Sequence, residues 1–355
     1  MSTHSFLSHF LIGFQGTDLP EDVSGLLSEG LAGVVLFRRN IESADQVREL
    51  TAKIRGVGGD DRIIAVDQEG GRVQRLKGIG TTIPAAAVVA GLGGDAVTIT
   101  GTIMACELAG LGFNTVFAPV MDVYMDTGDP VIGDRSFSAD PFVCAGLGAR
   151  VISAMNDSGI MACPKHFPGH GAANADSHKH LPLVDADYDT MSRRELVPFR
   201  GAVRNGARMI MTAHCLYSSL DSQNPASLSN RILNGLLRRS IGFDGVIVSD
   251  DLEMKAIADR YSLGETLDLG VKAGIDLFMY CSNPESAVKG AEILSGLYND
   301  DRMLLMLNNS YNRLQAVHEW IRSNAGQRKK WMGMDFEKLV LMGQNDLVHY
   351  GINND

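Results

Sequence analysis

Short apolar segments recur along the chain and alternate with longer amphipathic ones. The apolar segments cover residues 9–14, 32–37, 62–67, 114–118, 160–166, 208–213, 245–250 and 275–280. Most are rich in Val, Ile, Phe or Met at every position, which is typical of parallel strands that are covered on both faces. We therefore expect eight buried parallel strands.

The segments between these strands have the spacing of amphipathic helices. Residues 43–55 begin with Ser43, a residue type that caps helices, and repeat apolar residues every three or four positions. The same pattern covers residues 187–205, 230–241 and 263–273, each followed by a glycine that favours the end of a helix. After Tyr280 the pattern predicts helices alone, at residues 284–297, 302–322 and 335–347.

Eight strands alternating with helices predict an α/β protein with a (β/α)8 TIM barrel. An open, doubly wound sheet is the main alternative. Its dinucleotide-binding form is disfavoured because no G-x-G-x-x-G motif follows the first strand. We expect a single domain in which residues 1–300 form the barrel and residues 301–355 form C-terminal helices packed on it.

Composition and charge narrow the classes of function. The 355 residues are 45% hydrophobic and 21% charged, which is ordinary for a globular protein with a full core. A net charge of −10 repels phosphate backbones, so we expect no nucleic-acid partner. The chain shows no secretion signal and no apolar run of membrane-spanning length. Five scattered cysteines predict neither a disulfide framework nor a zinc ribbon. We expect a cytoplasmic protein without a membrane partner.

Titratable residues gather where the predicted strands end. The third, fifth, sixth and seventh strands end in such residues, and the loop after the fourth strand carries more: Asp67, Arg75, Arg135, Lys165, His166, His214, Asp250 and Asp251. The carboxyl ends of barrel strands share one face, which carries the chemistry in TIM-barrel enzymes. This face is therefore the expected site. Of the adjacent Asp250 and Asp251, we expect only one to face the barrel mouth and the other to cap the next helix.

A loop at residues 169–178, rich in glycine and alanine, carries Asp176 and His178. Its composition predicts a mobile lid. A carboxylate two residues from an imidazole can orient that imidazole and raise its pKa, which suits general acid/base catalysis. The same residues could ligate a metal together with His166 and His170. Because no H-E-x-x-H helix is present, we expect no metal.

Five motifs carry a family resemblance. They are V-D-Q-E-G-G-R-V-Q-R at 66–75, G-D-R-S-F at 133–137, K-H-F-P-G-H-G at 165–171, D-S-H at 176–178 and S-D-D-L-x-M at 249–254. Together they resemble glycoside hydrolase family 3, in particular its single-domain bacterial β-N-acetylglucosaminidases, which trim cell-wall muropeptides. The resemblance spans about residues 10–285, and no motif could be assigned to residues 286–355.

The resemblance implies a retaining glycosidase that needs no cofactor. It implies that Asp250 is the nucleophile, that His178 is the general acid/base and that Asp176 orients His178. The residues that it implies for binding the hydroxyl and acetamido groups of the sugar are Asp67, Arg75, Arg135, Lys165 and His166. The expected partner is a small carbohydrate or a muropeptide, and the chain is expected to be a monomer or a homodimer.

Three other functions remain open at this point. The chain could be a β-glucosidase of the same family, or a glycoside phosphorylase, since an imidazole acid/base does not repel an incoming phosphate as a carboxylate does. It could also be a sugar-binding protein without catalytic activity. That last alternative is disfavoured because both Asp250 and His178 are present.

Overall fold

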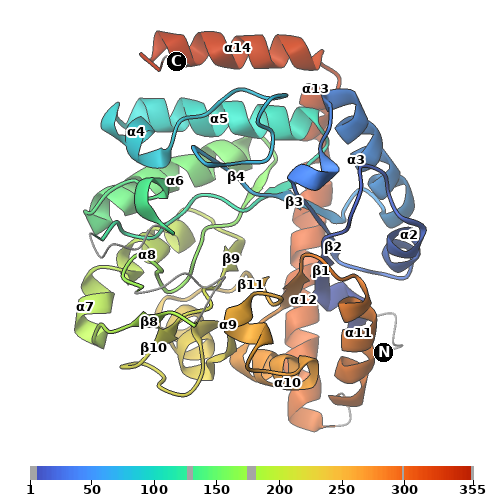
Figure 1. Cartoon of the computed structure of the whole chain (residues 1–355), viewed down its shortest axis with the longest axis vertical. Coiled ribbons are helices and arrows are strands. Elements are labelled where there is room, and N and C mark those ends of the chain that lie inside the picture. Colours follow the sequence, from blue (N-terminus) through green and yellow to red (C-terminus); the bar gives the residue numbers. More distant parts are fainter. Residues whose placement is uncertain (1–5, 126–130, 174–180, 298–299, 353–355) are drawn as a thin grey trace.

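The computed structural model describes residues 6–125, 131–173, 181–297 and 300–352. A parallel sheet lies at its centre (Figure 1). The sheet has eight strands in the order β7-β6-β3-β2-β1-β12-β11-β9. The strands are β1 (Phe10–Ile12), β2 (Gly33–Leu36), β3 (Ile63–Val66), β6 (Thr115–Val116), β7 (Met161–Ala162), β9 (Met209–Met211), β11 (Val246–Asp251) and β12 (Leu277–Tyr280). Each overlaps one predicted apolar segment, which confirms the predicted (β/α)8 barrel.

The barrel closes through an irregular stretch of chain between β7 and β9. The amide of Met211 donates to the carbonyl of Pro164 (3.0 Å), and the amide of Phe167 donates to the carbonyl of Met211 (2.8 Å). The amide of Ala213 then donates to the carbonyl of Phe167 (2.7 Å). The segment that carries Lys165 and His166 is therefore itself part of the barrel wall.

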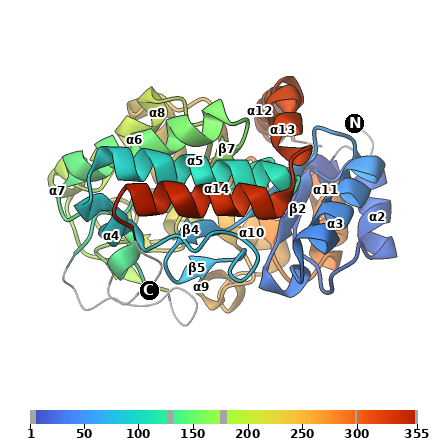
Figure 2. The same ribbon diagram turned by 90° about the horizontal axis from the view of Figure 1, so that it is seen from above.

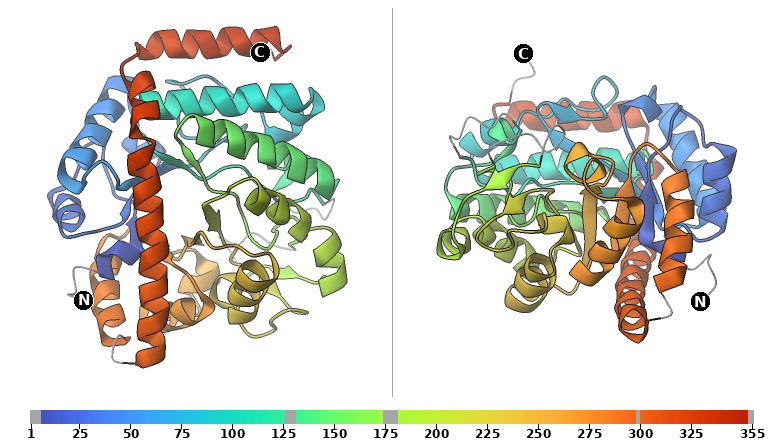
Figure 3. Two further views of the ribbon diagram at one scale, coloured as in Figure 1. Left: turned by 180° about the vertical axis from the view of Figure 1, so that it is seen from behind. Right: turned by 60° about the horizontal axis from the view of Figure 1, so that its bottom comes forward.

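Apolar side chains fill the barrel interior, and the long helix α12 (Asp301–Ser323) covers one end of it (Figure 3). Three side chains of α12 belong to the same buried cluster as the interior residues: Leu314, Val317 and Ile321. Arg313 of α12 contacts Asp276, directly before β12, and His318 contacts the carbonyl of Asp61, just before β3. Because both partners precede strands, α12 closes the amino end and leaves the carboxyl end for chemistry.

Helices surround the barrel. They are α2 (Glu21–Ser28), α3 (Ala44–Gly58), α4 (Ala86–Gly91), α5 (Gly94–Gly110), α6 (Pro141–Asp157), α7 (Tyr188–Arg193), α8 (Leu196–Arg204), a π-helix at Arg231–Ser240, α9 (Lys255–Ala258), α10 (Leu263–Ala273) and α11 (Glu285–Leu297). Ser43 caps α3 as expected, accepting the amide of Gln46 at 3.2 Å. Helix α10 has the predicted bounds. The pattern missed α5, which is buried on most sides and so lacks an amphipathic period.

The prediction of one helix over residues 187–205 is wrong, because the chain breaks between α7 and α8. At the break, Arg194 leaves helical geometry (φ −123°, ψ −81°) and its guanidinium contacts the carboxylate of Glu195. Glu195 is thereby turned inwards, to 2% exposure. A Cβ on Gly169 would lie 2.7 Å from the Cβ of Glu195. The glycine therefore lets the segment that follows His166 pack closely against Glu195.

The chain ends in α13 (Ala325–Met332) and α14 (Phe336–His349), and α14 lies along α5 (Figure 2). The close approach needs Gly343, where a Cβ would lie 2.8 Å from Ile103. The predicted boundary at residue 300 stays a prediction. No helix in the described part of the chain has the length and hydrophobicity that crossing a bilayer requires.

A buried carboxyl on α5, Glu107, links this helix to the loop before α4. Its two oxygens each lie 3.0 Å from the amide nitrogen of Thr81. Burial raises the pKa of Glu107 to about 7, although the hydroxyl and amide of Thr81 oppose the rise. The folded chain thus holds this proton more tightly than the unfolded chain does. Below about pH 4.5 the carboxyl is protonated in both the folded and the unfolded chain, so a change in pH there does not alter its effect on the unfolding free energy. As the pH rises from 4.5 towards 7, the carboxyl lowers the unfolding free energy, because it ionises more readily in the unfolded chain.

We therefore expect Glu107→Gln to flatten the dependence of stability on pH. Between pH 5 and pH 8 the wild type should lose about 2 to 3 kcal/mol of unfolding free energy through this one group. In Glu107→Gln this contribution is absent, so its unfolding free energy should fall by about 2 to 3 kcal/mol less than that of the wild type over the same pH range. Urea unfolding at the two pH values measures the difference, with Glu49→Gln on the exposed face of α3 as the control. Equal pH dependence in wild type and Glu107→Gln would contradict a raised pKa.

Candidate active site

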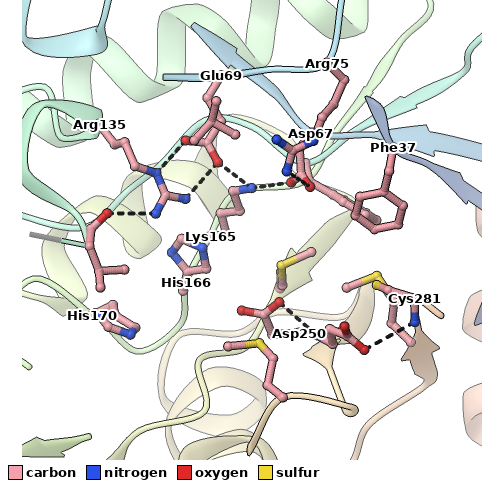
Figure 4. Close-up of a pocket in the computed structure, with 17 residues that line it drawn as sticks. Phe37, Asp67, Glu69, Arg75, Arg135, Lys165, His166, His170, Asp250 and Cys281 are labelled. Carbon is pink, nitrogen blue, oxygen red and sulfur yellow. Dashed lines mark hydrogen bonds and ion pairs between the residues drawn. The ribbon is translucent and has the colours of Figure 1, made fainter. Parts of the chain in front are cut away.

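A pocket of about 210 Å³ opens at the carboxyl end of the barrel (Figure 4). Its lining includes six of the eight residues that the family resemblance implies for catalysis or sugar binding: Asp67, Arg75, Arg135, Lys165, His166 and Asp250. They come from β11 and from the segments that follow β3, β6 and β7, so the strand ends bring together residues far apart in the chain. The other two, Asp176 and His178, lie outside the described residues.

Charges of alternating sign line one wall of the pocket (Figure 4). The Nζ of Lys165 lies 2.7 Å from Oδ1 of Asp67 and 2.6 Å from Oε1 of Glu69. Arg135 grips Glu69 with two parallel contacts, at 2.7 Å from Nε and 2.8 Å from a terminal nitrogen. Arg75 contacts the other oxygen of Asp67 at 3.2 Å. The result is one connected row, Arg135–Glu69–Lys165–Asp67–Arg75, which we call the charge ladder.

Within the charge ladder, Glu69, Lys165 and Arg135 stabilise one another's charged forms. Burial alone would raise the pKa of Glu69, but Lys165 and Arg135 hold that pKa far below its usual value. Burial alone would lower the pKa of Lys165, but Asp67 and Glu69 raise it above its usual value. The side chains of Lys165 and Glu69 are only 3% and 4% exposed. Removing one member would therefore leave a buried charge without its partner.

A hairpin holds Arg75 over Asp67. Its strands are β4 (Gln68–Gly70) and β5 (Val73–Gln74), and the turn has positive φ at Gly70 (99°) and Gly71 (55°). Those backbone angles explain the glycine pair in the sequence motif. The side-chain oxygen of Gln68 accepts the amide of Arg75 at 2.9 Å, which fixes the far arm of the hairpin above the strand end.

Asp250 ends a buried strand and points into the pocket (Figure 4). Burial alone would raise the pKa of Asp250, but His166 and His214 in their protonated forms, the amide of Asp251 and the cation of Lys165 lower it below its usual value. The amide of Asp251 donates to this carboxylate at 2.8 Å. Asp250 is therefore an ionised, sheltered carboxylate at neutral pH.

The expected split between Asp250 and Asp251 is wrong, because both line the pocket. Asp251 does not cap the next helix, which begins after Met254. Its carboxylate accepts the amides of Glu253 (3.1 Å) and Cys281 (3.2 Å) and so joins the turn after β11 to β12. Burial raises the pKa of Asp251 to about 6. The strand bulges here, and this irregularity breaks the simple alternation of side chains.

Two acidic residues of the site were missed in the sequence. Glu69 lies two residues after Asp67 in the same motif. In an extended segment this spacing places both side chains on the same side, which could have identified Glu69. Asp122 follows the fourth strand by several residues and offered no such signal. It is fully buried, and its carboxylate lies 2.7 Å from Nδ1 of His166. Among the described residues, no group of three or more His, Cys, Asp or Glu side chains has the arrangement of a metal site.

Comparison with known proteins gives a consistent result. Residues 15–315 match the family described as the glycosyl hydrolase family 3 N terminal domain. A β-hexosaminidase of Nitrosomonas eutropha is 37% identical over 79% of this chain and 83% of its own length. One from Tolumonas auensis is 36% identical over 87% and 94%. The solved structure of NagZ from Neisseria gonorrhoeae superposes with a TM-score of 0.80 at 30% identity, covering 98% of each chain.

Proposed function

The chain belongs to glycosyl hydrolase family 3, and on that premise we propose that it is a retaining β-N-acetylhexosaminidase that releases terminal β-linked N-acetylglucosamine. The observation that carries this proposal is the position of Asp250, an ionised carboxylate in a pocket whose opposite wall is the charge ladder. The names of the relatives support the same substrate class.

The charge ladder suits a neutral, hydroxyl-rich ligand. Each sugar hydroxyl both donates and accepts hydrogen bonds, and the ladder offers cationic donors beside anionic acceptors along one wall. Asp67 and Arg75 are its most exposed members, at 16% and 28% of their side chains. We propose that these two, with Arg135, Lys165 and His166, bind the sugar.

The proposed reaction has two steps. In the first, a carboxylate oxygen of Asp250 attacks the anomeric carbon, the bond to the leaving oxygen breaks, and His178 protonates that oxygen. In the second, His178 takes a proton from water, which attacks the anomeric carbon and releases Asp250 as a carboxylate. Two inversions give net retention. Asp176 orients the imidazole of His178 and favours its protonated form.

We propose cell-wall muropeptides as the natural substrate and the cytoplasm as the location. The support is the D-S-H motif at residues 176–178, which accompanies the K-H-F-P-G-H-G motif in the muropeptide-trimming branch that the sequence resembles. We also propose that residues 301–355 serve the barrel as packed helices and that the chain acts as a monomer or a homodimer.

The experiment that tests this function compares aryl β-N-acetylglucosaminide with aryl β-glucoside, each with and without phosphate. We expect fast hydrolysis of the first, little of the second, and no phosphorolysis. A fluorinated glycosyl substrate that stabilises the glycosyl-enzyme should then label the peptide containing Asp250. Equal or faster turnover of the glucoside would contradict the proposed N-acetylglucosaminide substrate. A label on another peptide would contradict the assignment of Asp250 as the nucleophile.

His178→Ala should affect substrates according to their leaving groups. A poor leaving group needs protonation, so hydrolysis of an unactivated disaccharide should fall about 10²- to 10⁴-fold. Dinitrophenolate leaves without protonation, so the rate of glycosyl-enzyme formation from a dinitrophenyl glycoside should fall far less. His180→Ala, which removes the imidazole two positions further along the sequence, is the matched control and should behave like the wild type. A uniform loss across leaving groups would contradict the acid role of His178.

A further inference from the structure

One carboxylate of this region has no place in the pocket lining. Asp122 lies behind His166, with no exposed surface, in the segment that follows β6. Its carboxylate faces three groups of the segment after β7: Nδ1 of His166 at 2.7 Å, the amide of His166 at 3.3 Å and the amide of His170 at 2.6 Å. Asp122 thus holds the backbone and the ring of the residue that follows Lys165.

The contact with Asp122 determines which nitrogen of His166 carries the proton. Burial alone would raise the pKa of Asp122, but His166 and the amide of His170 help to lower it, so the group is a carboxylate and only accepts. Nδ1 of His166 must therefore donate. Burial lowers the pKa of His166 even though Asp122 opposes this, so the ring is neutral at neutral pH. A neutral ring with a proton on Nδ1 has a lone pair on Nε2.

The ring of His166 lines the pocket while its Nδ1 is engaged behind it, so Nε2 is the nitrogen left for a ligand (Figure 4). The acceptors of the charge ladder, Asp67 and Glu69, are each engaged by cations. In contrast, Nε2 of His166 is a neutral hydrogen-bond acceptor. A sugar hydroxyl that enters the pocket needs an acceptor for its proton, and Nε2 can accept it.

We propose that Asp122 is a positioning residue that locks His166 in the tautomer with the proton on Nδ1, so that Nε2 accepts a hydrogen bond from one hydroxyl of the bound sugar. The identity of the ligand as a sugar rests on the proposed function. The tautomer itself depends only on the geometry of Asp122 and His166.

The first test is the Asp122→Asn variant, which keeps the shape but places an amide donor beside the ring. The Asn side chain should donate to Nδ1, which moves the ring proton to Nε2 and removes the acceptor. We expect kcat/KM for aryl β-N-acetylglucosaminide to fall about 10- to 100-fold, the range found when the group that orients a metal-binding imidazole is changed. Glu107→Gln is the matched control. Glu107 is also a buried carboxyl that accepts a backbone amide, but it lies outside the pocket lining, and its variant should stay within about twofold of wild-type kcat/KM.

The second test needs no variant of Asp122 and so remains decisive if Asp122→Asn does not fold. Nitrogen-15 NMR of histidine-labelled wild-type protein distinguishes the two tautomers, and His166→Gln identifies the signal of this ring by its loss. We expect a protonated Nδ1 and an unprotonated Nε2 in the wild type. A proton on Nε2 of wild-type His166 would overturn the inference, as would Asp122→Asn with unchanged kcat/KM.

A third test identifies the hydroxyl. Substrates in which single hydroxyls are replaced by fluorine, which cannot donate, should each be assayed with wild type and Asp122→Asn. For the substrate whose fluorine replaces the donating hydroxyl, Asp122→Asn and wild type should have the same kcat/KM. If Asp122→Asn lowers kcat/KM equally for every fluorinated substrate, no hydroxyl donates a hydrogen bond to His166. If the wild type hydrolyses no β-N-acetylglucosaminide while the expected tautomer is seen, the proposed function fails and the tautomer stands.

Discussion

Asp250→Asn is expected to lower kcat for aryl β-N-acetylglucosaminide at least about 10³-fold, more than any other single substitution should with this activated substrate. The amide is nearly isosteric with the carboxylate but is a very weak nucleophile, so the glycosyl-enzyme should not form. The amide can still accept the hydrogen bond that the backbone of Asp251 donates at 2.8 Å. The fold should therefore be retained, and a neutral side chain in this half-buried position should not reduce the unfolding free energy.

Asp251→Asn is the control for this prediction. Its carboxylate lines the same pocket, is adjacent in sequence and accepts two backbone amides, which an amide oxygen can also do. We expect Asp251→Asn to keep kcat within about tenfold of the wild type. Steady-state kinetics with both variants, alongside circular dichroism to check the fold, decides the question. If Asp251→Asn is inactive and Asp250→Asn is active, the nucleophile has been assigned to the wrong carboxylate.

Lys165→Met should produce the largest loss of stability among the pocket residues. The substitution keeps the length of the side chain but removes the charge between Asp67 and Glu69, which are 2.7 and 2.6 Å from Nζ. Breaking a buried ion pair by removing one partner costs about 3 to 5 kcal/mol, because the remaining charge is left buried. Arg135 and Arg75 still hold the two carboxylates, so we expect about 3 kcal/mol, together with a large loss of kcat/KM.

The matched control is Lys53→Met on α3. Lys53 also bridges two carboxylates, Asp18 at 2.9 Å and Glu49 at 3.0 Å, but its side chain is 43% exposed. Water screens such an exposed pair, so its removal should change the unfolding free energy little. Urea unfolding of both variants measures the contrast. If Lys165→Met is no less stable than Lys53→Met, the charge ladder does not depend on its central cation.

The strands could be predicted well because their physical cause is local. A parallel strand covered on both faces needs apolar side chains at nearly every position, and eight such segments are visible in the sequence. Caps are equally local, which is why Ser43 marked the start of α3 correctly. Helix α5 and the break at Arg194 could not be predicted, because both depend on neighbours. Burial on most sides removes the amphipathic pattern of α5, and the inward turn of Glu195 depends on Gly169.

The barrel, and the position of titratable residues at the carboxyl ends of its strands, could be predicted from the amino-acid sequence alone. Strand ends can be recognised along the chain, and all parallel strands end on the same face. Which side chains pair could be learned from the folded chain alone. Lys165 meets Asp67 across 98 positions, and His166 meets Asp122 across 44. Charge state, tautomer and the roles of Glu69 and Asp122 follow from these contacts, because burial and partner distance are properties of the folded chain and not of any segment of it.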